Sequence, residues 1–392
     1  MKNKQKKILT IIGTRPEAIK MAPIIKELKN CTSGVETFVC STGQHREMLA
    51  QAFSDFEIEP DLQLDVMSHD QGLSLLSARL FTALDDLYSR FTPDAVLVQG
   101  DTTTVQIAAT AAFYRNISIG HVEAGLRSHN MRSPFPEEFN RKICGLVTDW
   151  HFAPTLVAKQ NLLSEAIAED SILVTGNTVI DALLWMRKRL QKAVPSLPTS
   201  IETAIREHRT IILATGHRRE NFGEGISQIL AAIKELAERH PEIRIVYPVH
   251  LNPNVHSIVY ERLGKTPNIL LCEPLAYKQL IFVMDASHLI ITDSGGIQEE
   301  GPAIGKPVLV TRDVTERPEG VKAGVSILVG PHRDMILSHA ERLLKDREIY
   351  SRISRKANPY GDGNAAWRIS RFLSKKLGFC HAGLEDHEEQ LA

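Results

Sequence analysis

A short run of β-branched and aliphatic residues recurs along this chain, and each run is followed by a turn and an amphipathic stretch of helical period. Strands that alternate with helices form parallel sheets, because each helix carries the chain back to the edge where the next strand begins. We therefore predict an α/β fold with strands at 7–12, 37–41, 95–99, 118–123, 151–153, 172–175, 210–214, 244–249, 269–272, 289–292, 307–310 and 326–329.

These strands are too many for one tidy open sheet, and 392 residues are enough for two domains. The helical period is weakest at 191–209, where Pro195, Ser196 and Pro198 interrupt it, so we place the interdomain link there. Each half then forms a doubly wound domain. In such sheets ligands bind beyond the carboxyl ends of the strands, so the polar residues just after strands are the candidate site residues.

The charge balance and the cysteines exclude several classes of protein. Lys and Arg number 46 and Asp and Glu 47, so the formal charge is −1 and the chain lacks the cationic excess of a nucleic-acid-binding protein. Its apolar runs are far shorter than the roughly 20 residues of a membrane-spanning helix, and the one after the basic start is too short for a signal peptide. Five cysteines without a C-x-x-C pair indicate neither a disulfide framework nor a zinc site. We expect a cytoplasmic protein.

The first strand runs directly into a helix start at 13–20. Pro16 and Glu17 suit the first turn of any helix, the proline through its fixed φ and the carboxylate through the helix dipole. That ordinary role leaves Arg15 and Lys20 unexplained. Both can point toward an anion held at this helix start, and we favour that function over a purely structural role.

Carboxylates follow the later strands of the first half. Asp101 stands between a strand and a helix, where an N-cap role explains it as well as catalysis does. Glu123 follows its strand without an obvious capping role, and Glu137 or Glu138 opens a helix. Carboxylates from three segments at one sheet edge suggest proton transfer, since neighbouring carboxyl groups can be held in different protonation states.

Cations and glycines stand at the corresponding positions of the second half. His217 and Arg218 follow a strand, and a histidine beside arginines at a strand exit is better explained by an anionic ligand than by a surface role. The turn 293–296 contains two glycines whose amides can approach a phosphate, although a plain turn capped by its Asp or Ser explains it too. Glu300, one turn into the next helix, can accept both hydroxyl protons of a ribose.

Five motifs of the chain occur together in one enzyme family: Gly13-Thr14-Arg15-Pro16-Glu17-Ala18-Ile19-Lys20, Gly100-Asp101-Thr102-Thr103, His121-Val122-Glu123-Ala124-Gly125-Leu126-Arg127, Thr215-Gly216-His217-Arg218-Arg219 and Asp293-Ser294-Gly295-Gly296. By these motifs, in this order, the chain resembles the non-hydrolysing UDP-N-acetylglucosamine 2-epimerases. The segment from Pro16 to Lys20 separates that branch from the hydrolysing relatives.

The resemblance implies two Rossmann-like doubly wound domains in the arrangement of B-type glycosyltransferases, with the active site in the interdomain cleft. The expected domains are 1–180 and 181–363, of which the second binds UDP. A helix at about 364–378 is expected to join the first domain, and the tail at 379–392 to be disordered. The resemblance also implies a homodimer, with neither NAD nor a metal as cofactor.

By matching position, the resemblance implies a catalytic set of Asp101, Glu123, Glu137 and His217, and a substrate-binding set of Arg15, Lys20, Arg218, Leu275, Leu280, Ser294, Gly295, Gly296, Glu300 and Arg317. Some relatives have Gln and Phe at the positions of Leu275 and Leu280. Some bacterial members hold a second, activating substrate molecule, and the residues that match this allosteric site are Gln44, His45, Gln71 and His250. Asp70, before Gln71, departs from the Arg of the regulated type.

The implied activity is the reversible epimerisation of UDP-N-acetylglucosamine (UDP-GlcNAc) to UDP-N-acetylmannosamine (UDP-ManNAc), which supplies an amino sugar for surface polysaccharide synthesis. No carbonyl stands beside sugar carbon 2 to stabilise a carbanion, so loss of UDP from carbon 1 has to assist, through a 2-acetamidoglucal intermediate. Cations then bind the leaving diphosphate while carboxylates move the carbon-2 proton. The alternatives are a UDP-sugar-dependent glycosyltransferase, an epimerase of a modified UDP-amino sugar, and a nucleotide-sugar-binding or regulatory protein without catalysis.

Overall fold

The computed structural model describes residues 5–31, 34–43, 46–66, 71–216, 218 and 221–380, except for the side chains of residues 46–48 and 254. The chain divides into two compact units. Unit 1 comprises Met1–Ala182 and Gly361–Ala392, and unit 2 comprises Leu183–Tyr360. Each unit is built on one sheet of parallel strands, which confirms the α/β fold class.

Unit 1 is an alternation of strands and helices, closed by a helix from the end of the chain. Its elements are β1 (Lys6–Ile12), α1 (Arg15–Lys29), β2 (Val35–Ser41), α2 (Arg46–Asp55), β3 (Leu62–Gln63), α3 (Leu73–Phe91), β4 (Ala95–Gln99), α4 (Thr103–Tyr114), β5 (Ser118–Val122), α5 (Glu137–Val147), β6 (Trp150–Ala153), α6 (Leu156–Ser164), a 3₁₀ turn (Glu169–Ser171), β7 (Ile172–Val174), the first part of α7 (Thr178–Leu190) and α16 (Ala365–Leu377).

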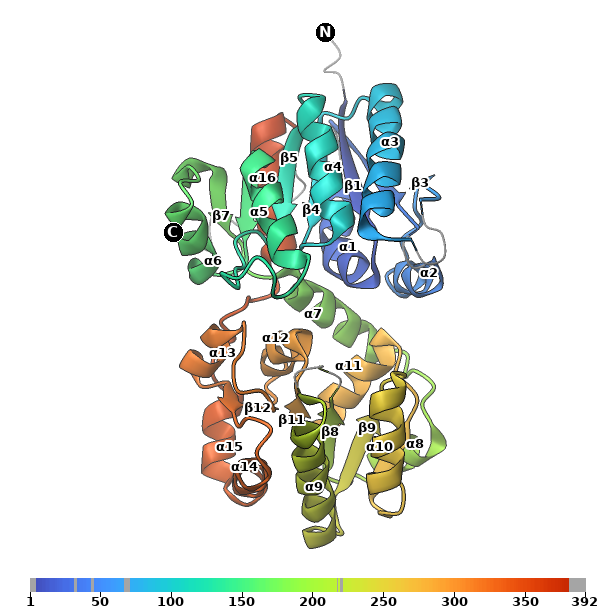
Figure 1. The fold of residues 1–392 in the computed structure, drawn as a ribbon, viewed down its shortest axis with the longest axis vertical. Helices are drawn as coiled ribbons and strands as arrows, with labels where there is room; N and C mark the ends of the chain where they lie inside the picture. The colour runs from blue at the N-terminus through green and yellow to red at the C-terminus, as the bar shows by residue number, and fades with distance from the viewer. Residues whose placement is uncertain are drawn as a thin grey trace. The chain divides into compact units, whose positions relative to one another are not determined.

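The sheet of unit 1 has the strand order β3-β2-β1-β4-β5-β6-β7, and all neighbouring pairs are parallel. Helices α3, α4 and α5 lie on one face of it, while α1 and α16 lie on the other (Figure 1). Burial on both faces explains why β1 and β4 read as nearly continuous apolar runs. The six strands predicted for this half are present. The short edge strand β3 was not predicted, because two residues leave no pattern to detect.

Unit 2 repeats the plan with shorter connections. Its elements after α7 are α8 (Thr199–Arg206), β8 (Ile211–Thr215), α9 (Glu224–Arg239), β9 (Arg244–Pro248), α10 (Pro253–Leu263), β10 (Ile269–Cys272), α11 (Tyr277–Ala286), β11 (Ser287–Thr292), α12 (Gly295–Ala303), β12 (Val308–Val310), α13 (Pro318–Ala323), β13 (Ser326–Leu328), α14 (Arg333–Lys345) and α15 (Arg347–Ser354). The strand order is β10-β9-β8-β11-β12-β13, again with parallel pairs, and all six strands predicted for this half are present.

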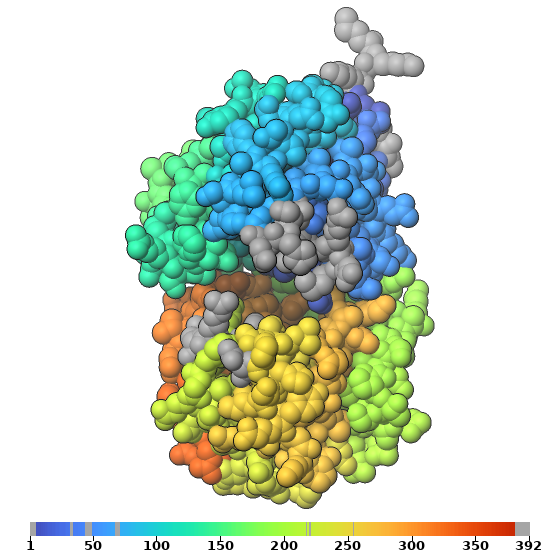
Figure 2. All heavy atoms as spheres, turned by 45° about the vertical axis from the view of Figure 1, so that its right-hand side comes forward, coloured from blue at the N-terminus to red at the C-terminus, as the bar shows by residue number. Residues whose placement is uncertain are grey.

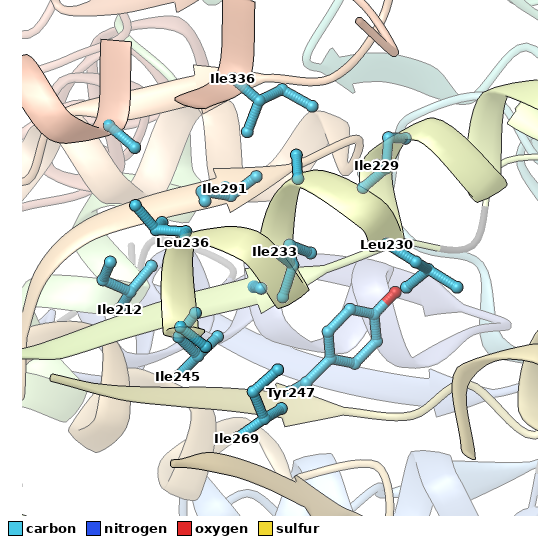
Figure 3. Packing of buried hydrophobic residues seen from close by; sticks show 14 of the residues in the cluster. Ile212, Ile229, Leu230, Ile233, Leu236, Ile245, Tyr247, Ile269, Ile291 and Ile336 are labelled. Atoms are coloured by element: carbon cyan, nitrogen blue, oxygen red, sulfur yellow. The ribbon is translucent and has the colours of Figure 1, made fainter. Parts of the chain in front are cut away.

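The core of unit 2 lies between its sheet and the helices α9 and α14. Figure 3 shows how α9 lays its apolar face on the strands, with α14 beside it; the labelled side chains are Ile212, Ile229, Leu230, Ile233, Leu236, Ile245, Tyr247, Ile269, Ile291 and Ile336. Each fully buried aliphatic side chain of this kind stabilises the fold by about 1.5–3 kcal/mol relative to an exposed one. This packing holds the carboxyl ends of β8 and β11, and therefore the turns that follow them, in fixed positions.

The boundary between the units falls inside a helix. Unit 1 ends at Ala182 and unit 2 begins at Leu183, both within α7. The link predicted at 191–209 is therefore wrong: that stretch belongs to unit 2 and contains α8. Prolines and serines mark an irregular segment of chain, but not the place where contacts change from one core to the other. Of the tail predicted at 379–392, residues 381–392 lie outside the described residues.

Each sheet has one point at which the order of its strands reverses. In unit 1 it lies between β1 and β4, and in unit 2 between β8 and β11. The helices that follow the two strands of such a pair leave toward opposite faces of the sheet, and the crevice between them is the usual ligand position in this class of fold. We call these places switch point 1 and switch point 2. Four of the five sequence motifs begin at one of them.

None of the helices in the described part of the chain combines the length and the apolar character that a membrane span requires. All five cysteines carry free thiols, and Cys40, Cys144 and Cys272 are buried.

Candidate functional site

Glu123 is the centre of a hydrogen-bonded cluster at the carboxyl edge of the sheet in unit 1. It follows β5 and has a φ of 65°, in the left-handed region that non-glycine residues rarely adopt. Lys20 from α1 donates to both carboxylate oxygens, at 2.7 Å to Oε1 and 2.6 Å to Oε2. Gln99 Nε2 donates to Oε2, and Asn177 Nδ2 to Oε1 at 3.2 Å. Several donors thus fix a nearly buried carboxylate in one orientation.

Gly125, two residues later, explains why this turn needs a glycine. Its φ is 88°, and a Cβ atom there would lie 2.3 Å from the backbone oxygen of Ala158 in α6. No side chain fits at that distance. The glycine of this motif therefore allows close packing of the turn against α6, and this packing supports the unusual backbone of Glu123 next to it.

Asp101 is held by the helix α5. Arg141 Nη2 donates to Asp101 Oδ2 at 2.6 Å, and Asn140 Nδ2 donates to the Asp101 backbone oxygen at 2.9 Å. The N-cap of α4 is Thr102, whose hydroxyl accepts from the backbone amide of Val105. The interpretation of Asp101 as an N-cap is therefore wrong, because Thr102 has that role. The Asp101 carboxylate instead binds Arg141 of α5.

The two glutamates that open α5 have different surroundings. Glu138 is fully buried and accepts from the amides of Ser128 (2.9 Å) and His129 (3.1 Å) and from Arg141 (3.0 Å). Burial raises its pKa, but these donors outweigh burial and leave the pKa below the ordinary value. Glu137 is half-buried, and its Oε2 atom is buried without a hydrogen-bond partner among the described residues. Of the pair, Glu137 is the carboxyl group that the protein's own donors leave available.

Two neutral histidines lie beneath the acidic cluster. His121 on β5 and His151 on β6 are register partners, and both are almost fully buried. Burial lowers the pKa of each to about 4. His121 Nε2 donates to the backbone oxygen of Gly100 at 2.8 Å, which ties the turn before Asp101 to β5. At neutral pH these rings carry no charge, so they support the carboxylates without neutralising them.

Glu17 spans switch point 1. It is 2% exposed and accepts from Gly13 N at 2.6 Å, from Thr14 Oγ1 at 3.0 Å and from Thr102 Oγ1 at 2.8 Å. Burial raises its pKa to about 7, although the hydrogen bonds from Gly13, Thr102 and Thr14 act in the opposite direction. The sequence indicated an ordinary helix-start residue here. The structure adds that the same carboxylate contacts the turn after β4.

Two arginines converge on the start of α12 at switch point 2. A Cβ atom on Gly295 would lie 3.7 Å from Arg218 Nη2 and 3.9 Å from Arg317 Cζ. Arg317 is paired with Glu299, while Arg218 Nε is buried without a hydrogen-bond partner among the described residues. The first turn of α12 has no acidic residue, and its N-cap Ser294 makes no side-chain cap bond. Cations and a helix start together form an anion-binding arrangement.

Asp293 fastens the two turns of switch point 2 together. It is 1% exposed, and its Oδ2 atom accepts from the backbone amide of Arg218 at 2.9 Å and from Asn221 Nδ2 at 3.3 Å. The hydroxyl groups of Thr215 and Thr292 hydrogen bond at 2.6 Å. Arg218 is therefore placed from its backbone, independently of any ligand. Of the two residues that could cap this turn, Ser294 holds the N-cap position without a side-chain cap bond, whereas Asp293 binds across the crevice.

The remaining residues predicted for nucleotide binding lie close to α12 or on α11. Glu300 is 5% exposed and accepts from Tyr277 Oη at 2.9 Å, and its Oε2 atom lies 3.7 Å from where a Cβ of Gly296 would be. Leu275 is buried just before α11, and Leu280 is half-buried on that helix.

Arg15 begins α1 and is half-buried. Lys20 lies one turn further along α1 and binds Glu123. His217 lies outside the described residues.

Of the four residues predicted for an allosteric site, the structure describes two, one in each unit. Gln44 and His45 lie outside the described residues. Gln71 belongs to unit 1, where its Oε1 atom accepts from Arg79 at 3.1 Å. His250 belongs to unit 2; it is exposed, and its Nδ1 atom accepts from the amide of Asn252. His250 precedes α10. The segment around this helix, drawn in yellow, is exposed on the face that Figure 2 shows. In the part of the chain that the structure describes, no group of three His, Cys, Asp or Glu side chains could hold a metal ion.

Sequence reasoning missed the donors that orient the carboxylates. Gln99, Asn177 and Arg141 contact Glu123 or Asp101 from positions 24, 54 and 40 residues away in the chain. One signal was present for the first two, because Gln99 ends β4 and Asn177 follows β7, and both are therefore polar residues at strand exits. Arg141 has no comparable signal, since it lies in the middle of an amphipathic helix.

The chain is similar in sequence to proteins of one known family. A family model described as UDP-N-acetylglucosamine 2-epimerase matches residues 26–374. The UDP-N-acetylglucosamine 2-epimerase of Yersinia pestis is 49% identical over 370 residues, which cover 94% of this chain and 98% of that protein.

Two solved structures extend the likeness to three dimensions. The crystal structure of the UDP-GlcNAc 2-epimerase from Neisseria meningitidis, bound to UDP-GlcNAc, has a TM-score of 0.85 and 46% identity, and covers 94% of this chain and 100% of that chain. The UDP-GlcNAc 2-epimerase from Methanocaldococcus jannaschii, in complex with UDP-GlcNAc and UDP, has a TM-score of 0.78 and 32% identity, and covers 94% and 99%.

Proposed function

This chain belongs to the UDP-N-acetylglucosamine 2-epimerase family, as its motifs predicted, and from that membership we propose that it reversibly converts UDP-GlcNAc to UDP-ManNAc. The observation that carries the proposal is the cluster around Glu123, in which Lys20, Gln99 and Asn177 orient a nearly buried carboxylate at the carboxyl edge of a sheet. An epimerase that removes an unactivated proton needs an oriented carboxylate of this kind.

In the proposed reaction, switch point 2 holds the nucleotide. Arg218, Arg317 and the amides at the start of α12 bind the diphosphate, and Glu300 accepts the hydroxyl protons of the ribose. As the bond between carbon 1 and the diphosphate oxygen breaks, negative charge grows on the leaving UDP. Positive groups that are already in place stabilise that charge without reorganisation, which lowers the barrier to elimination. The family resemblance also implies Arg15 as a substrate-binding residue.

The carboxylates of unit 1 handle the proton of carbon 2. In the proposed elimination, one of them takes this proton as UDP leaves, which gives 2-acetamidoglucal and UDP; UDP then adds back to carbon 1 while a proton is delivered to carbon 2 from the opposite face. We assign these transfers to Asp101, Glu123 and Glu137, with His217 as a further catalytic group. Donors from the protein orient Asp101 and Glu123, whereas Glu137 Oε2 has no hydrogen-bond partner among the described residues.

The test is the reaction in deuterated water. Purified protein is incubated with UDP-GlcNAc, and carbon 2 of both epimers is followed by NMR. We expect a reversible mixture of the gluco and manno epimers with deuterium at carbon 2. Epimerisation without solvent deuterium would contradict acid/base exchange with solvent, and release of UDP that requires a sugar acceptor would identify a glycosyltransferase instead. A modified UDP-amino sugar as the better substrate would narrow the proposal to that sugar.

Two further properties belong to the same proposal. We propose a cytoplasmic homodimer, on the basis of the family resemblance and of thiols that stay free in a reducing compartment. Light scattering on the purified protein gives the mass directly, and a monomer at micromolar concentration would contradict the dimer. The UDP-ManNAc formed serves surface polysaccharide synthesis, which loss of the polysaccharide in a deletion strain would support.

A further inference from the structure

Glu17 is a buried carboxylate to which the proposed reaction assigns no step. It lies in the first turn of α1 and is 2% exposed. An apolar side chain of similar volume would satisfy the packing there at lower cost, because a buried carboxylate loses its hydration. Burial raises its pKa to about 7, which expresses the same cost in terms of its ionisation. The hydrogen bonds of Glu17 therefore have to explain its position.

Those hydrogen bonds join two turns that are far apart in the sequence. Gly13 and Thr14, which donate to Glu17, belong to the turn after β1. Thr102, which also donates to it, belongs to the turn after β4 and lies 85 residues from Glu17. Strands β1 and β4 are neighbours in the sheet, and the order reverses between them. Glu17 thus bridges the crevice of switch point 1.

Thr102 extends the bridge into a second helix. Its Oγ1 atom accepts from the backbone amide of Val105 at 3.3 Å, which caps α4, and donates to Glu17 Oε1 at 2.8 Å. A hydroxyl group has one proton, so the cap bond leaves that proton free to point at Glu17. The starts of α1 and α4 are therefore connected through two side chains.

The residues tied by this bridge are the direct neighbours of two proposed site residues. Thr14 precedes Arg15, and Thr102 follows Asp101. Any change in the separation of the two turns moves the Arg15 guanidinium and the Asp101 carboxylate relative to each other. Because a misplacement of about 1 Å can cost about 100-fold in rate, the bridge acts on the step in which both groups take part.

We propose that Glu17 is a positioning residue of the epimerase reaction: it holds the turn after β4 against the turn after β1, and so sets the placement of Asp101 relative to Arg15. This inference rests on the proposed function, since it concerns the same carboxylates. Glu17 itself touches no substrate in this role; it acts through Thr14 and Thr102.

The decisive variants are at Thr102, and the chain offers a matched control. Thr155 is the N-cap of α6 in the same unit, and its Oγ1 atom accepts from the amide of Ala158 at 3.1 Å. Thr102→Val and Thr155→Val each remove one threonine cap, but only the first removes a donor to Glu17. We expect Thr102→Val to lower kcat about 10- to 100-fold with KM within about twofold. Thr155→Val should leave kcat within about twofold. The fall in Tm should be similar in the two variants, because each loses one helix cap. Thr102→Ser keeps the hydroxyl group and should restore most of kcat.

Glu17→Gln tests the bridge from its other end. The variant replaces one acceptor oxygen by an NH₂ group, which then faces either the Gly13 amide or the two threonine hydroxyls. We expect a loss of kcat with UDP affinity within about twofold, since Arg218 and Arg317 of switch point 2 are untouched. Equal kcat for Thr102→Val and Thr155→Val, or a loss that appears entirely in KM, would overturn the proposal.

Hydrogen exchange separates failure of the bridge from failure of the proposed function. If the unmodified protein does not epimerise UDP-GlcNAc, the proposed function fails by itself. Amide exchange of the peptides covering 13–20 and 99–105 then decides the bridge. Faster exchange in both segments of Glu17→Gln supports it, whereas a change confined to 13–20 shows that Glu17 serves only its own helix and overturns it.

Discussion

The two switch points have the same backbone plan, but their helix starts are occupied differently. At switch point 1 the first turn of α1 contains its own carboxylate, and Glu17 already accepts from Gly13 N and from two threonine hydroxyls. At switch point 2 the first turn of α12 contains no acidic residue, and two arginines lie beside it. Neither helix has a side-chain cap bond, but the first turn of α1 carries a carboxylate of its own, whereas the first turn of α12 carries none and favours an anion from outside.

This difference teaches how to interpret a helix start in a sequence. The motif at 13–20 predicted an anion beside Arg15 and Lys20, and it predicted only a favourable partner of the helix dipole in Glu17, the third residue of α1. In the structure this carboxylate accepts from the Gly13 amide and from the hydroxyls of Thr14 and Thr102, so the first turn of α1 carries a carboxylate of its own. The structure correspondingly places Lys20 on Glu123. Unit 1 therefore gathers carboxylates and their donors, and unit 2 gathers cations without a carboxylate in the first turn.

The largest expected effect comes from removing the central carboxylate of unit 1. Glu123→Gln should lower kcat by about 10²- to 10⁴-fold, the usual contribution of general acid/base catalysis, and should leave UDP affinity within about twofold because the cations of unit 2 are untouched. The matched control is Glu165→Gln, which breaks the ion pair of Glu165 with Arg127 in the same unit. Steady-state kinetics and UDP titration calorimetry measure both. A parallel fall of kcat in the control would break the comparison.

The converse change is in unit 2. Arg218→Ala should weaken UDP binding about 10- to 100-fold, since a hydrogen bond to a charged group contributes about 1.5–3 kcal/mol. The control is Arg333→Ala, which removes an exposed arginine paired with Glu235 in the same unit. Unchanged UDP affinity in Arg218→Ala, measured by calorimetry at fixed salt concentration, would remove the anion-binding role of switch point 2.

A third prediction concerns the cost of the buried acids in unit 1. Burial raises the pKa of Asp181 from 3.8 to about 6. A carboxyl group whose pKa is higher in the folded protein than in the unfolded chain stabilises the fold at pH values below its unfolded pKa. This stabilisation is lost as the pH rises through the folded pKa. Above pH 6, Asp181 therefore lowers the free energy of unfolding by about 3 kcal/mol. In Asp181→Asn this loss is absent. The difference in Tm between variant and unmodified protein should therefore shift in favour of the variant from pH 4 to pH 7 and then stay constant; a difference independent of pH would contradict the assignment.

The smallest expected effect comes from a tyrosine behind switch point 2. Tyr360 Oη donates to the backbone oxygen of Arg317 at 2.9 Å and accepts from Gly320 N at 2.8 Å. Tyr360→Phe should lower UDP affinity about threefold to tenfold, the effect of about 1 kcal/mol for a neutral hydrogen bond. Tyr350→Phe, which removes the bond to the His288 backbone oxygen in the same unit, serves as the control and should leave UDP affinity unchanged.

The sequence predicted the strands well because burial on both faces makes each one a compact apolar run. The break in the helical period predicted the position of the link between the units poorly, since α7 continues through the boundary at Ala182 and a regular helix carries no mark of a change of core. The Pro- and Ser-rich stretch 191–209 breaks the helical pattern, as a linker between domains would, but it lies wholly within unit 2.

The candidate site divides in the same way. Asp101 and Glu123 could be predicted because both stand at strand exits, where a parallel sheet collects its ligand-binding groups. The bonds that orient them could not. Thr102 lies 85 residues from Glu17, and Asn177 lies 54 residues from Glu123, so each pair exists only once the strands are in register. A single residue type at a strand exit indicates which chemistry is possible. The orientation of its side chain depends on contacts with residues far away in the sequence.

The discontinuity of unit 1 has a consequence for the order of synthesis. Helix α16 contacts α1, the amide of Ala366 donates to Asp181 at 2.8 Å, and Arg368 donates to the Thr175 backbone oxygen at 2.9 Å. These contacts need residues that leave the ribosome after the whole of Leu183–Tyr360, which is one continuous stretch. Unit 2 therefore has all of its residues before unit 1 does, although domains usually mature from the N-terminus onward. The unit that carries the carboxylates is begun first and finished last.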